Sequence, residues 1–569
     1  MARSYRWIIG ALKSESFCCR VRSSGSLGAG DSPAVLRSGG VYRGPYSRRV
    51  LLRVASPQQR ELRTLAGEMR FVRSQEGHQC DPGADSGRPV FIFWLYWGAE
   101  VRVFLYSGLA EFLGRFGEVI VLTPFLPDAL RECFSEVKWR MVPSPRVRLW
   151  RARLHSLANR AHGEWVKKYF SDLGVADRAA RFDPVAASFS QRISDVIARI
   201  ACNRPAVHLL NHVTTRSLPV NRRWFTEIVP STEKRRTVFI TSDSLSMPGL
   251  IAANSALSVS GWPVVFYPSN WRDVFKGARV GRQFTELVLW NDQQAKVLLR
   301  NNPWHRPETL TVIGSSQFDS HFREDWLLPR EQFFAHLGLD PNRPLVCYSA
   351  VSDSAYKGEA QIVAQFVREL QRSPDGKKVQ VVVRLNPSGS DPNYRALAAQ
   401  FPSTVAVNQP NWWNVTGSGL TGRWKANTPQ DARFFTNLIE HCELNVGLPS
   451  SVMLDFGVRG RPSVAVAFDS PGAVEADSRA SDFLKQGFFL DALHRRAFEM
   501  GRTPVDIAAI VRRICISGAA EPDRLREYVE ETVGGNDGLV HEQLGGFLVA
   551  LSMGSPGISQ TRANWSAVG

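Results

Sequence analysis

The sequence predicts an α/β protein with two doubly wound, Rossmann-like domains that face each other across a cleft. Three observations support this prediction. The chain has 569 residues, which is more than one hydrophobic core usually organises. Short apolar runs alternate with helix-length segments in two separate series, as in parallel sheets. The residues between the two series, 326–344, have the composition of a linker with one short helix.

The segment 438–469 shows this alternation most clearly. An apolar run at 443–447 ends in Leu-Pro-Ser-Ser, and the helix-length segment 452–458 follows. Gly460-Arg461-Pro462 stops that helix before the next apolar run at 463–468. Strand, turn, helix, Gly-Pro stop and strand make a βαβ unit. Ligands of such units lie beyond the carboxyl ends of the strands.

Small and polar residues stand where this unit would bind a ligand. Gly447 ends the first strand, and Ser450 and Ser451 open the helix with hydroxyls and free N–H groups that suit a phosphate. Asp455 lies one helical turn further, within reach of a ribose. The plain alternative is that Ser450 is an N-cap and Asp455 a solvated helix residue.

The remaining chain extends the same pattern in both directions. The first series of expected strands lies at 90–97, 118–123, 237–241, 264–267, 284–290 and 309–313. The second adds strands at 345–349 and 378–385, with helices at 330–337, 359–371, 505–516 and 522–533. Residues 128–235 between them are expected to be mostly helical and basic, with one strand at 206–210. The domains are therefore placed at 87–325 and 345–552, joined by 326–344.

The chain is basic, with a formal net charge of +17, and +9 of it lies in residues 1–70. Residues 1–86 are expected to be a disordered extension, and 553–569 a loose tail. A basic arm, a transit-like peptide and an upstream extension ahead of a start at Met69 all fit this composition, so it does not indicate nucleic-acid binding.

Cysteine and hydropathy patterns suggest a cytoplasmic protein. The eight cysteines are scattered without a C-x-x-C pair, which fits a reducing compartment. No apolar run reaches the roughly 18 residues that a membrane-spanning helix needs. The sequence also lacks an obvious D-x-D motif or His cluster, so no bound metal is expected.

Several motifs resemble those of the GT-B glycosyltransferase superfamily, whose fold is UDP-glycosyltransferase/glycogen phosphorylase-like. The turn with Ser450-Ser451, Asp455 and Gly460-Arg461-Pro462 is similar to its donor-binding segment. The loop 269–277, the segment 287–294 and the string 312–319 (VIGSSQFD) resemble motifs of surface-carbohydrate and capsule transferases. Arg384-Leu385-Asn386-Pro387 resembles the family's R-x-H-P, with Asn386 in place of His, and the family more often has Glu at the position of Asp455.

The resemblance implies a glycosyltransferase or polyol-phosphate transferase of surface polysaccharide or glycolipid biosynthesis. It implies no tightly bound cofactor, and a nucleotide-diphospho sugar or a CDP-polyol as donor substrate. The expected partners are this donor, a carbohydrate or lipid-linked acceptor and, through the acceptor, the inner face of the membrane. A nucleotide-sugar 2-epimerase and a non-catalytic nucleotide-sugar binder remain alternatives.

The resemblance and the strand ends together give the candidate site residues. The expected donor-binding residues are Ser349, Arg384, Asn386, Gly447, Ser450, Ser451 and Asp455. Arg384 would pair with diphosphate oxygens, or alternatively with Asp391. Asp243 is the first candidate for a catalytic base and His212 the second, although both also fit structural roles. Arg102 and Lys276 are expected to line the cleft.

Overall fold

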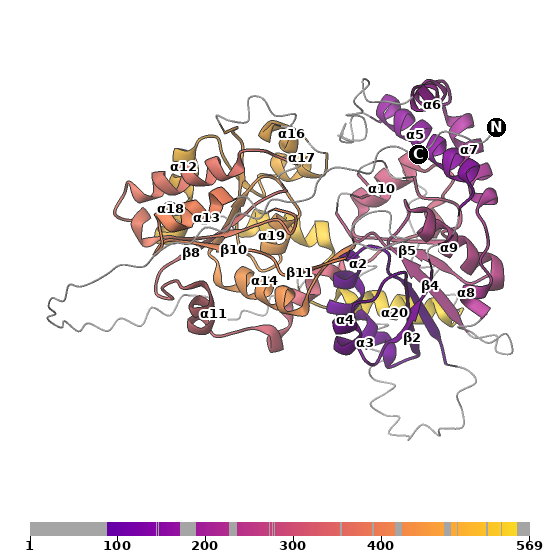
Figure 1. Ribbon diagram of the computed structural model, residues 1–569, viewed down its shortest axis with the longest axis horizontal. Coiled ribbons are helices and arrows are strands. Elements are labelled where there is room, and N and C mark those ends of the chain that lie inside the picture. Colours follow the sequence, from indigo (N-terminus) through magenta and orange to yellow (C-terminus); the bar gives the residue numbers. More distant parts are fainter. Residues whose placement is uncertain are drawn as a thin grey trace, which may run out of the picture. The chain divides into compact units, whose positions relative to one another are not determined.

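The computed structural model describes residues 88–554 except for positions 144, 146, 171–188, 227–235, 272, 276, 278, 353–354, 390–391, 416–423, 471–478, 486, 519–521 and 536. The basic extension and the final tail fall outside the described residues. The described chain forms two parallel sheets and a small antiparallel one (Figure 1). The two parallel sheets are separate, which confirms the predicted fold class, while the cleft between domains stays a prediction.

The first sheet has seven parallel strands in the order β3-β2-β1-β4-β5-β6-β7. Its strands are β1 (Val90–Trp94), β2 (Glu118–Thr123), β3 (Lys138–Met141), β4 (Thr237–Thr241), β5 (Val264–Phe266), β6 (Glu286–Leu289) and β7 (Leu310–Val312). The central strands β1 and β4 are buried along their whole length. This explains why they are continuous apolar runs rather than alternating ones.

The second sheet has six parallel strands in the order β10-β9-β8-β13-β14-β15. Its strands are β8 (Leu345–Ser349), β9 (Gln380–Arg384), β10 (Val405–Asn408), β13 (Leu444–Gly447), β14 (Ser463–Val466) and β15 (Glu499–Gly501). Alternate residues of β8 enter different cores: Val346 and Tyr348 join one cluster, Leu345 and Cys347 another. Helices therefore cover both faces of the sheet, as a doubly wound domain requires.

The two cores of the second sheet are closed by different helices. One face packs against α12 (Glu359–Gln371), α13 (Pro392–Gln400) and α18 (Pro504–Ser517), which lie together in Figure 1. The other face packs against α11 (Arg330–Leu337) and α14 (Pro429–His441). The predicted helices at 330–337 and 359–371 agree with α11 and α12.

A larger set of helices lies between the strands of the first sheet along the chain. They are α2 (Ala99–Val101), a π-helical turn η2 (Arg102–Tyr106), α3 (Leu109–Gly114), α4 (Asp128–Cys133), α5 (Leu149–Tyr169), α6 (Phe189–Ile200), α7 (Arg204–Ser217), α8 (Arg223–Thr226), α9 (Met247–Ser260) and α10 (Asp292–Asn301). The single helix expected at 101–116 is broken at Gly108, whose φ of 93° is left-handed.

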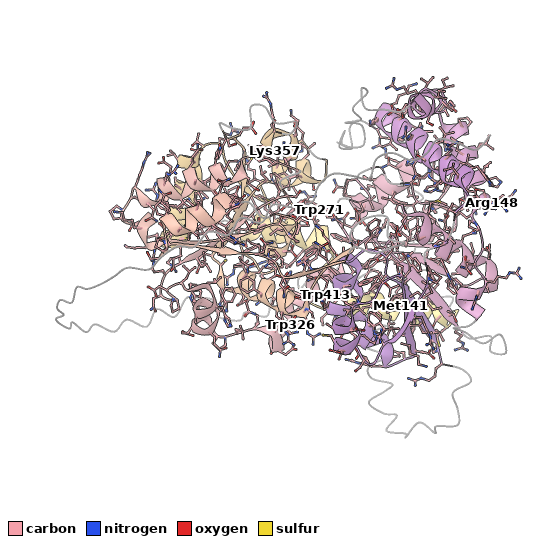
Figure 2. The ribbon with its side chains drawn as sticks, in the orientation of Figure 1. Met141, Arg148, Trp271, Trp326, Lys357 and Trp413 are labelled. Atoms are coloured by element: carbon pink, nitrogen blue, oxygen red, sulfur yellow. The ribbon has the colours of Figure 1, made fainter. Side chains whose placement is uncertain are left out.

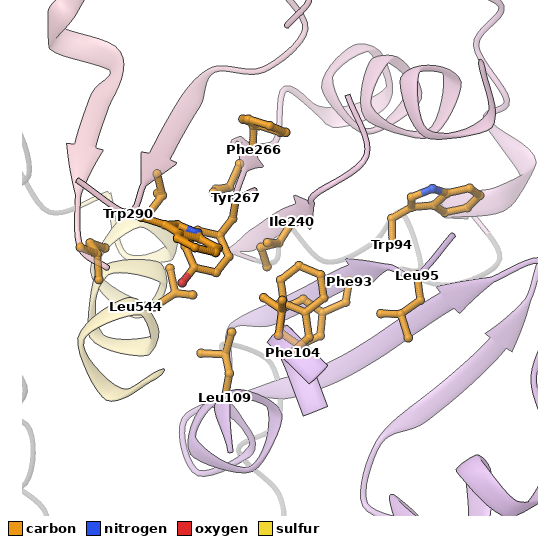
Figure 3. Close-up of a cluster of buried hydrophobic side chains, with 14 of the residues drawn as sticks. Phe93, Trp94, Leu95, Phe104, Leu109, Ile240, Phe266, Tyr267, Trp290 and Leu544 are labelled. Carbon is orange, nitrogen blue, oxygen red and sulfur yellow. The ribbon is translucent and has the colours of Figure 1, made fainter. Parts of the chain in front are cut away.

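The last helix, α20 (Val540–Ser552), packs against α3 and β4 of the first sheet. Figure 3 shows Leu544 of α20 beside Tyr267 and Trp290 in the apolar core of that sheet. The expected division of the chain placed residues 540–552 with the second domain. No helix was predicted at these residues, and a local sequence pattern carries no signal for the surface on which a helix docks.

Two segments differ from the sequence prediction because their local signals are mixed. The expected strand at 206–210 is part of α7, which Asn203 caps through a hydrogen bond from Ala206 N of 3.0 Å. Strand β3 lies at the edge of the first sheet in the region expected to be helical, and it is mostly exposed. An exposed edge strand lacks the apolar run that identifies a buried one.

An antiparallel hairpin and short helices complete the described chain. The hairpin pairs β11 (Trp412–Val415) with β12 (Trp424–Asn427). Trp413, labelled in Figure 2, packs against an apolar cluster that includes the strands of the first sheet and residues of the second domain such as Met453. The remaining helices are α15 (Val452–Gly457), α16 (Ala480–Leu484), α17 (Gly487–His494) and α19 (Pro522–Val533), with 3₁₀ turns at η5 (Pro307–Thr309), η6 (Ser316–Phe322), η7 (Glu324–Trp326) and η8 (Gly376–Lys378). Among the described helices, none combines the length and apolarity needed to cross a membrane.

Candidate functional site

Each parallel sheet has one point where the strand order reverses direction. In the first sheet the chain runs outward through β2 and β3, then returns to place β4 beside β1. In the second it runs outward through β9 and β10, then returns to place β13 beside β8. The crevice outside the carboxyl ends of strands at such a switch point is where open α/β sheets bind ligands. The strand ends of β1, β4, β8 and β13 therefore define the candidate site.

At the second switch point, the structure brings together three residues that are far apart in sequence. Ser349 at the end of β8 is in register with Gly447 on β13 and with Arg384 on β9. Gly447 is needed for this approach, because a Cβ there would lie 2.7 Å from the carbonyl oxygen of Ser349. The predicted convergence of these strand ends is confirmed.

Ser450 and Ser451 follow β13 and lie at the start of α15. Ser451 is the N-cap residue, yet it makes no side-chain capping hydrogen bond. The carbonyls, not the hydroxyls, take part in the turn: Ser450 O accepts from Met453 N at 3.2 Å, and Ser451 O from Leu454 N at 3.0 Å. Both residues are half-buried. Helix capping therefore does not explain why two serines stand here.

Arg384 is held by a buried carboxylate. Its guanidinium pairs with Asp431 at 2.8 Å, hydrogen bonds to Asn408 Oδ1, and lies 5.0 Å from the ring centre of Phe435. Asp431 also accepts from Trp412 Nε1 at 2.8 Å. The alternative of a structural salt bridge thus applies, but with Asp431 rather than Asp391, which lies outside the described residues. A diphosphate at Arg384 would have to compete with these contacts.

Asn386, two residues beyond Arg384, has a local structural role. Its Oδ1 accepts a hydrogen bond of 3.0 Å from Ser388 N, which forms a turn after β9. The side chain is half-buried. Its role in donor binding stays a prediction.

Two buried carboxyl groups meet at the switch point of the first sheet. Glu100 on α2 accepts from the backbone N–H groups of Tyr96 and Trp97 at 2.6 and 2.8 Å, and its other oxygen lies 2.6 Å from Ser242 Oγ. Glu100 thereby joins the segment after β1 to the segment after β4. Burial, and then the neighbouring Asp243, raise the pKa of Glu100 to about 8.

Asp243, the first candidate base, organises the turn that leads from β4 into α9. It accepts from Ser246 N at 2.9 Å and from Leu245 N at 3.3 Å, and it also contacts Ser246 Oγ. Gly249 leaves space for it, because a Cβ there would lie 2.3 Å from Asp243 Oδ2. Burial raises the pKa of Asp243, while these hydrogen bonds oppose the rise.

Arg102 and Asp455, predicted as site residues of opposite domains, are in direct contact. They form an ion pair in which the Asp455 side chain is 3% exposed. His321 Nε2 lies 3.0 Å from Asp455 Oδ1, and His321 Nδ1 lies 3.2 Å from Thr436 Oγ1. Burial alone raises the pKa of Asp455, but Arg102 and His321 outweigh it, so the net direction is downward. Burial lowers the pKa of His321, so a charged Asp455 faces one cation and a neutral imidazole.

The string 312–319 positions this ion pair. The carbonyl of Gln317 accepts from Arg102 Nε at 3.0 Å, and Ser316 Oγ donates to the carbonyl of Val103 at 2.9 Å. Asp319 accepts from His541 N on α20 at 2.6 Å. These contacts fix both the π-helical turn that begins at Arg102 and the helix that returns to the first sheet. The motif that resembles a family signature is thus used for docking.

Two predicted site residues are not joined to this constellation. His212 lies half-buried on α7, and no hydrogen bond or ion pair within the described residues connects it to Asp243 or Glu100. Lys276 lies outside the described residues. The catalytic and cleft roles of these two residues stay predictions.

Sequence reasoning missed Glu100, His321 and Asp431. Glu100 follows a strand-like run by a few residues, but a single acid in a first helical turn is ordinary. His321 lies just past the recognised string 312–319, so extending that string would have included it. Asp431 is a helix first-turn acid, and only the fold shows that it faces Arg384.

The described residues form no metal site at these strand ends, and one well-defined pocket lies elsewhere. Across the described positions, no group of three or more His, Cys, Asp or Glu could hold a metal ion. A pocket of about 440 Å³ lies at the amino ends of β1 to β3, around Arg88, Glu118 and Lys138. Because parallel sheets bind ligands at the opposite edge, we assign it no role.

Comparisons with known proteins return similar folds without close sequence relatives. No protein-family model matches the chain, and no curated protein matches it either. Similar solved structures include a UDP-GlcNAc 2-epimerase from Neisseria meningitidis bound to UDP-GlcNAc, at 10% identity and a TM-score of 0.43, covering 80% of this chain and 98% of the other.

Two further solved structures are similar over most of their length. A glycosyltransferase from Rickettsia africae ESF-5 is 9% identical with a TM-score of 0.42, covering 82% and 99% of the two chains. The wall teichoic acid polymerase TagF is 10% identical with a TM-score of 0.38, covering 86% and 96%. These are the kinds of protein that the sequence motifs resemble. With TM-scores below 0.5 they carry no argument about activity, and the fold rests on the two sheets described above.

Removing either partner of the Arg102–Asp455 pair should have unequal effects. Arg102→Ala leaves a buried carboxylate with only His321, and we expect a loss of about 3–5 kcal/mol. Asp455→Ala leaves Arg102, whose side chain is 21% exposed and can reach water, so it should cost less. Scanning calorimetry checks this order. Arg115→Ala, from the exposed pair with Glu111, is the control and should cost about 0–1 kcal/mol. Equal melting temperatures for Arg102→Ala and Arg115→Ala would contradict the ion pair.

Glu100 should make stability fall as pH rises. Between its ordinary pKa of 4.5 and about 8, the folded chain keeps a proton that the unfolded chain releases. The free energy of unfolding then decreases by about 1.4 kcal/mol per pH unit. Glu100→Gln removes this titration, so the melting temperature of the wild type should fall relative to the variant from pH 5 to pH 8. Glu111→Gln, at an exposed position, is the control and should give a parallel curve. A parallel curve for Glu100→Gln as well would mean that Glu100 is ionised throughout.

Proposed function

We propose that this chain is a transferase that moves a group from a nucleotide-activated donor to an acceptor. The proposal is carried by one observation: two serines without a capping role stand at the switch point of the second sheet, directly after β13. Their hydroxyls, together with the backbone N–H groups that open α15, suit the oxygens of a diphosphate. The finer proposal is a glycosyltransferase or polyol-phosphate transferase of surface polysaccharide or glycolipid biosynthesis.

In this proposal the donor diphosphate lies over Ser349, Gly447, Ser450 and Ser451. A nucleotide-diphospho sugar or a CDP-polyol fits, with no tightly bound cofactor. Asp455 would reach a ribose only if its pair with Arg102 opened, so donor binding and the contact between the sheets would compete. Binding of the nucleotide therefore depends mainly on Ser450 and Ser451.

The acceptor would approach the switch point of the first sheet, where Asp243 is the proposed base. A base must hold an electron pair within reach of the proton that it removes. In this proposal Asp243 is ionised, while Glu100, whose pKa burial raises to about 8, keeps its proton at neutral pH. Environments that separate the pKa values of a carboxyl pair are a usual way to divide acid and base roles.

Nucleotide binding tests the donor site. Calorimetric titration with UDP, CDP and GDP should give a Kd about 100-fold or more weaker in Ser450→Ala/Ser451→Ala than in the wild type, since two hydrogen bonds to a charged group are lost and each is worth about 1.5–3 kcal/mol. Ser403→Ala, at an exposed serine of the same domain, is the control. Equal affinity in the double variant and the control would place the nucleotide elsewhere.

Nucleotide release from the donor, measured on the purified protein, distinguishes the competing functions. A transferase releases soluble nucleotide from the donor only when an acceptor is present. A nucleotide-sugar 2-epimerase interconverts sugars without releasing nucleotide under turnover, and a non-catalytic binder shows only a thermal shift.

A lipid-linked acceptor would bring the chain to a membrane surface, and α6 offers a face for that contact. Ile193, Val196, Ile197 and Ile200 are exposed on it at helical spacing. The helices of this layer are also basic, at Arg151, Arg153, Lys167, Lys168, Arg199, Arg204 and Arg216. Exposed aliphatic side chains beside arginine and lysine suit the interface of an anionic bilayer.

Vesicle sedimentation tests this contact. The wild type should bind phosphatidylglycerol vesicles more strongly than phosphatidylcholine vesicles, and Ile197→Asp/Ile200→Asp should lose most of that binding. Val505→Asp, at an exposed position on α18, serves as the matched control. Undiminished binding of the α6 variant would show that another surface meets the lipid.

A further inference from the structure

Arg279 is a buried cation whose hydrogen-bond partners are all neutral. It is 5% exposed, and its guanidinium donates to Asn159 Oδ1 at 2.7 Å, Asn211 Oδ1 at 2.8 Å and Thr214 Oγ1 at 2.9 Å. Its remaining partner is His155 Nδ1 at 2.8 Å. No carboxylate within the described residues pairs with it. Buried charges are normally paired, because an isolated one is costly.

The histidines nearby do not supply the missing negative charge. Burial lowers the pKa of His155 to about 4, with Arg279 adding to the effect, and burial likewise lowers the pKa of His162 to about 4. These rings are neutral at pH 7, so the surroundings of Arg279 have a positive potential.

One hydrogen-bond donor beside this cation has no acceptor. Asn211 is fully buried. Its Oδ1 accepts a hydrogen bond from Arg279, and its Nδ2 has no partner. Buried donors in proteins almost always have an acceptor. An unmatched amide group beside an unmatched cation indicates that the acceptor is an anion.

The cluster lies at the edge of the first sheet where the acceptor is proposed to bind. The ring of His155 hydrogen bonds to the backbone of Leu245, two residues past Asp243. The ring of His162 bonds to the carbonyl of Asn301 at 2.7 Å and to the backbone of Gly277, in the loop after β5. Helices α5 and α7 therefore carry this polar group against the carboxyl ends of β4 and β5.

We propose that Arg279 and Asn211 form a binding site for a phosphate group. A phosphate supplies negative charge for the guanidinium and an acceptor oxygen for the unpaired donor. It could be free inorganic phosphate or a phosphate group carried by the acceptor. The second source rests on the proposed function, whereas the anion site itself does not.

The direct test replaces the anion by a carboxylate. Asn211→Asp keeps the oxygen that accepts from Arg279 and adds a negative charge at that position. In phosphate-free buffer the variant should melt at a higher temperature than the wild type. Inorganic phosphate should raise the melting temperature of the wild type beyond sodium chloride of equal ionic strength, and should have no such effect on Asn211→Asp.

Asn445→Asp is the matched control. Asn445 is fully buried on β13 with both amide atoms unpartnered, and no hydrogen bond from an arginine reaches it within the described residues. A new charge there should lower the melting temperature. If Asn211→Asp is destabilised as strongly as Asn445→Asp, or if phosphate stabilises it as much as it stabilises the wild type, the cluster is satisfied by water and the proposal is wrong.

A second variant keeps the proposal testable should Asn211→Asp not fold. Asn211→Leu is nearly isosteric but removes the unpaired Nδ2, and it should weaken phosphate binding by about tenfold, the usual effect of one such hydrogen bond. An unchanged phosphate affinity would contradict the site.

The source of the phosphate is determined by comparing ligands. Inorganic phosphate and glycerol 1-phosphate are each titrated into the Ser450→Ala/Ser451→Ala variant, so that binding at the nucleotide site is excluded. Retained phosphate binding there, with nucleotide binding lost, separates this site from the donor site. Binding of glycerol 1-phosphate would support a phosphorylated acceptor, and binding of inorganic phosphate alone would support a resident anion. Binding of neither would refute the site even if the transferase proposal holds.

Discussion

The buried charge of Asp455 is the constraint on which the relation of the two sheets depends. It lies on α15, directly beyond the switch point of the second sheet, and its counter-ion Arg102 lies just beyond β1 of the first. A carboxylate that is 3% exposed cannot remain ionised without such a partner. The docking contacts of the string 312–319 and of α20 serve to hold Arg102 in place. Any ligand that binds Asp455 must therefore also change this contact.

The second constraint is the parallel topology, which gathers the informative residues at one edge of each sheet. Glu100 and Ser242 bridge β1 and β4, and Ser349 meets Gly447 across β8 and β13. Both bridges lie where the strand order reverses. The same topology explains why the polar cluster around Arg279 lies close to the proposed acceptor position, although α5 and α7 belong to a helical layer. A parallel sheet places its functional residues at the carboxyl ends of its strands, whatever reaction they serve.

Much of this arrangement is predictable from sequence, because buried parallel strands are continuous apolar runs. The strands that end at Ser349 and Gly447 agree with the structure, and the convergence of their ends follows from parallel pairing. The contact partners of individual side chains are harder to predict from the sequence. Arg384 was expected at a diphosphate, yet its partner is Asp431, more than forty residues away in sequence. The edge strand β3 and the docking of α20 were also missed, because exposed strands and long-range packing leave no local pattern. The string 312–319, recognised in the sequence, contacts Arg102 and α20 rather than a ligand. It ends two residues before His321.

Hydrogen exchange in the presence and absence of UDP tests the central claim most directly, namely that the ligand lies at the switch point of the second sheet. The account predicts slower exchange on binding in peptides that contain 348–352 and 447–455, because the nucleotide covers the segments after β8 and β13. Peptides around Arg88, Glu118 and Lys138, at the amino ends of the first sheet, should be unaffected. Protection confined to those amino ends, with none after β8 and β13, would contradict the account.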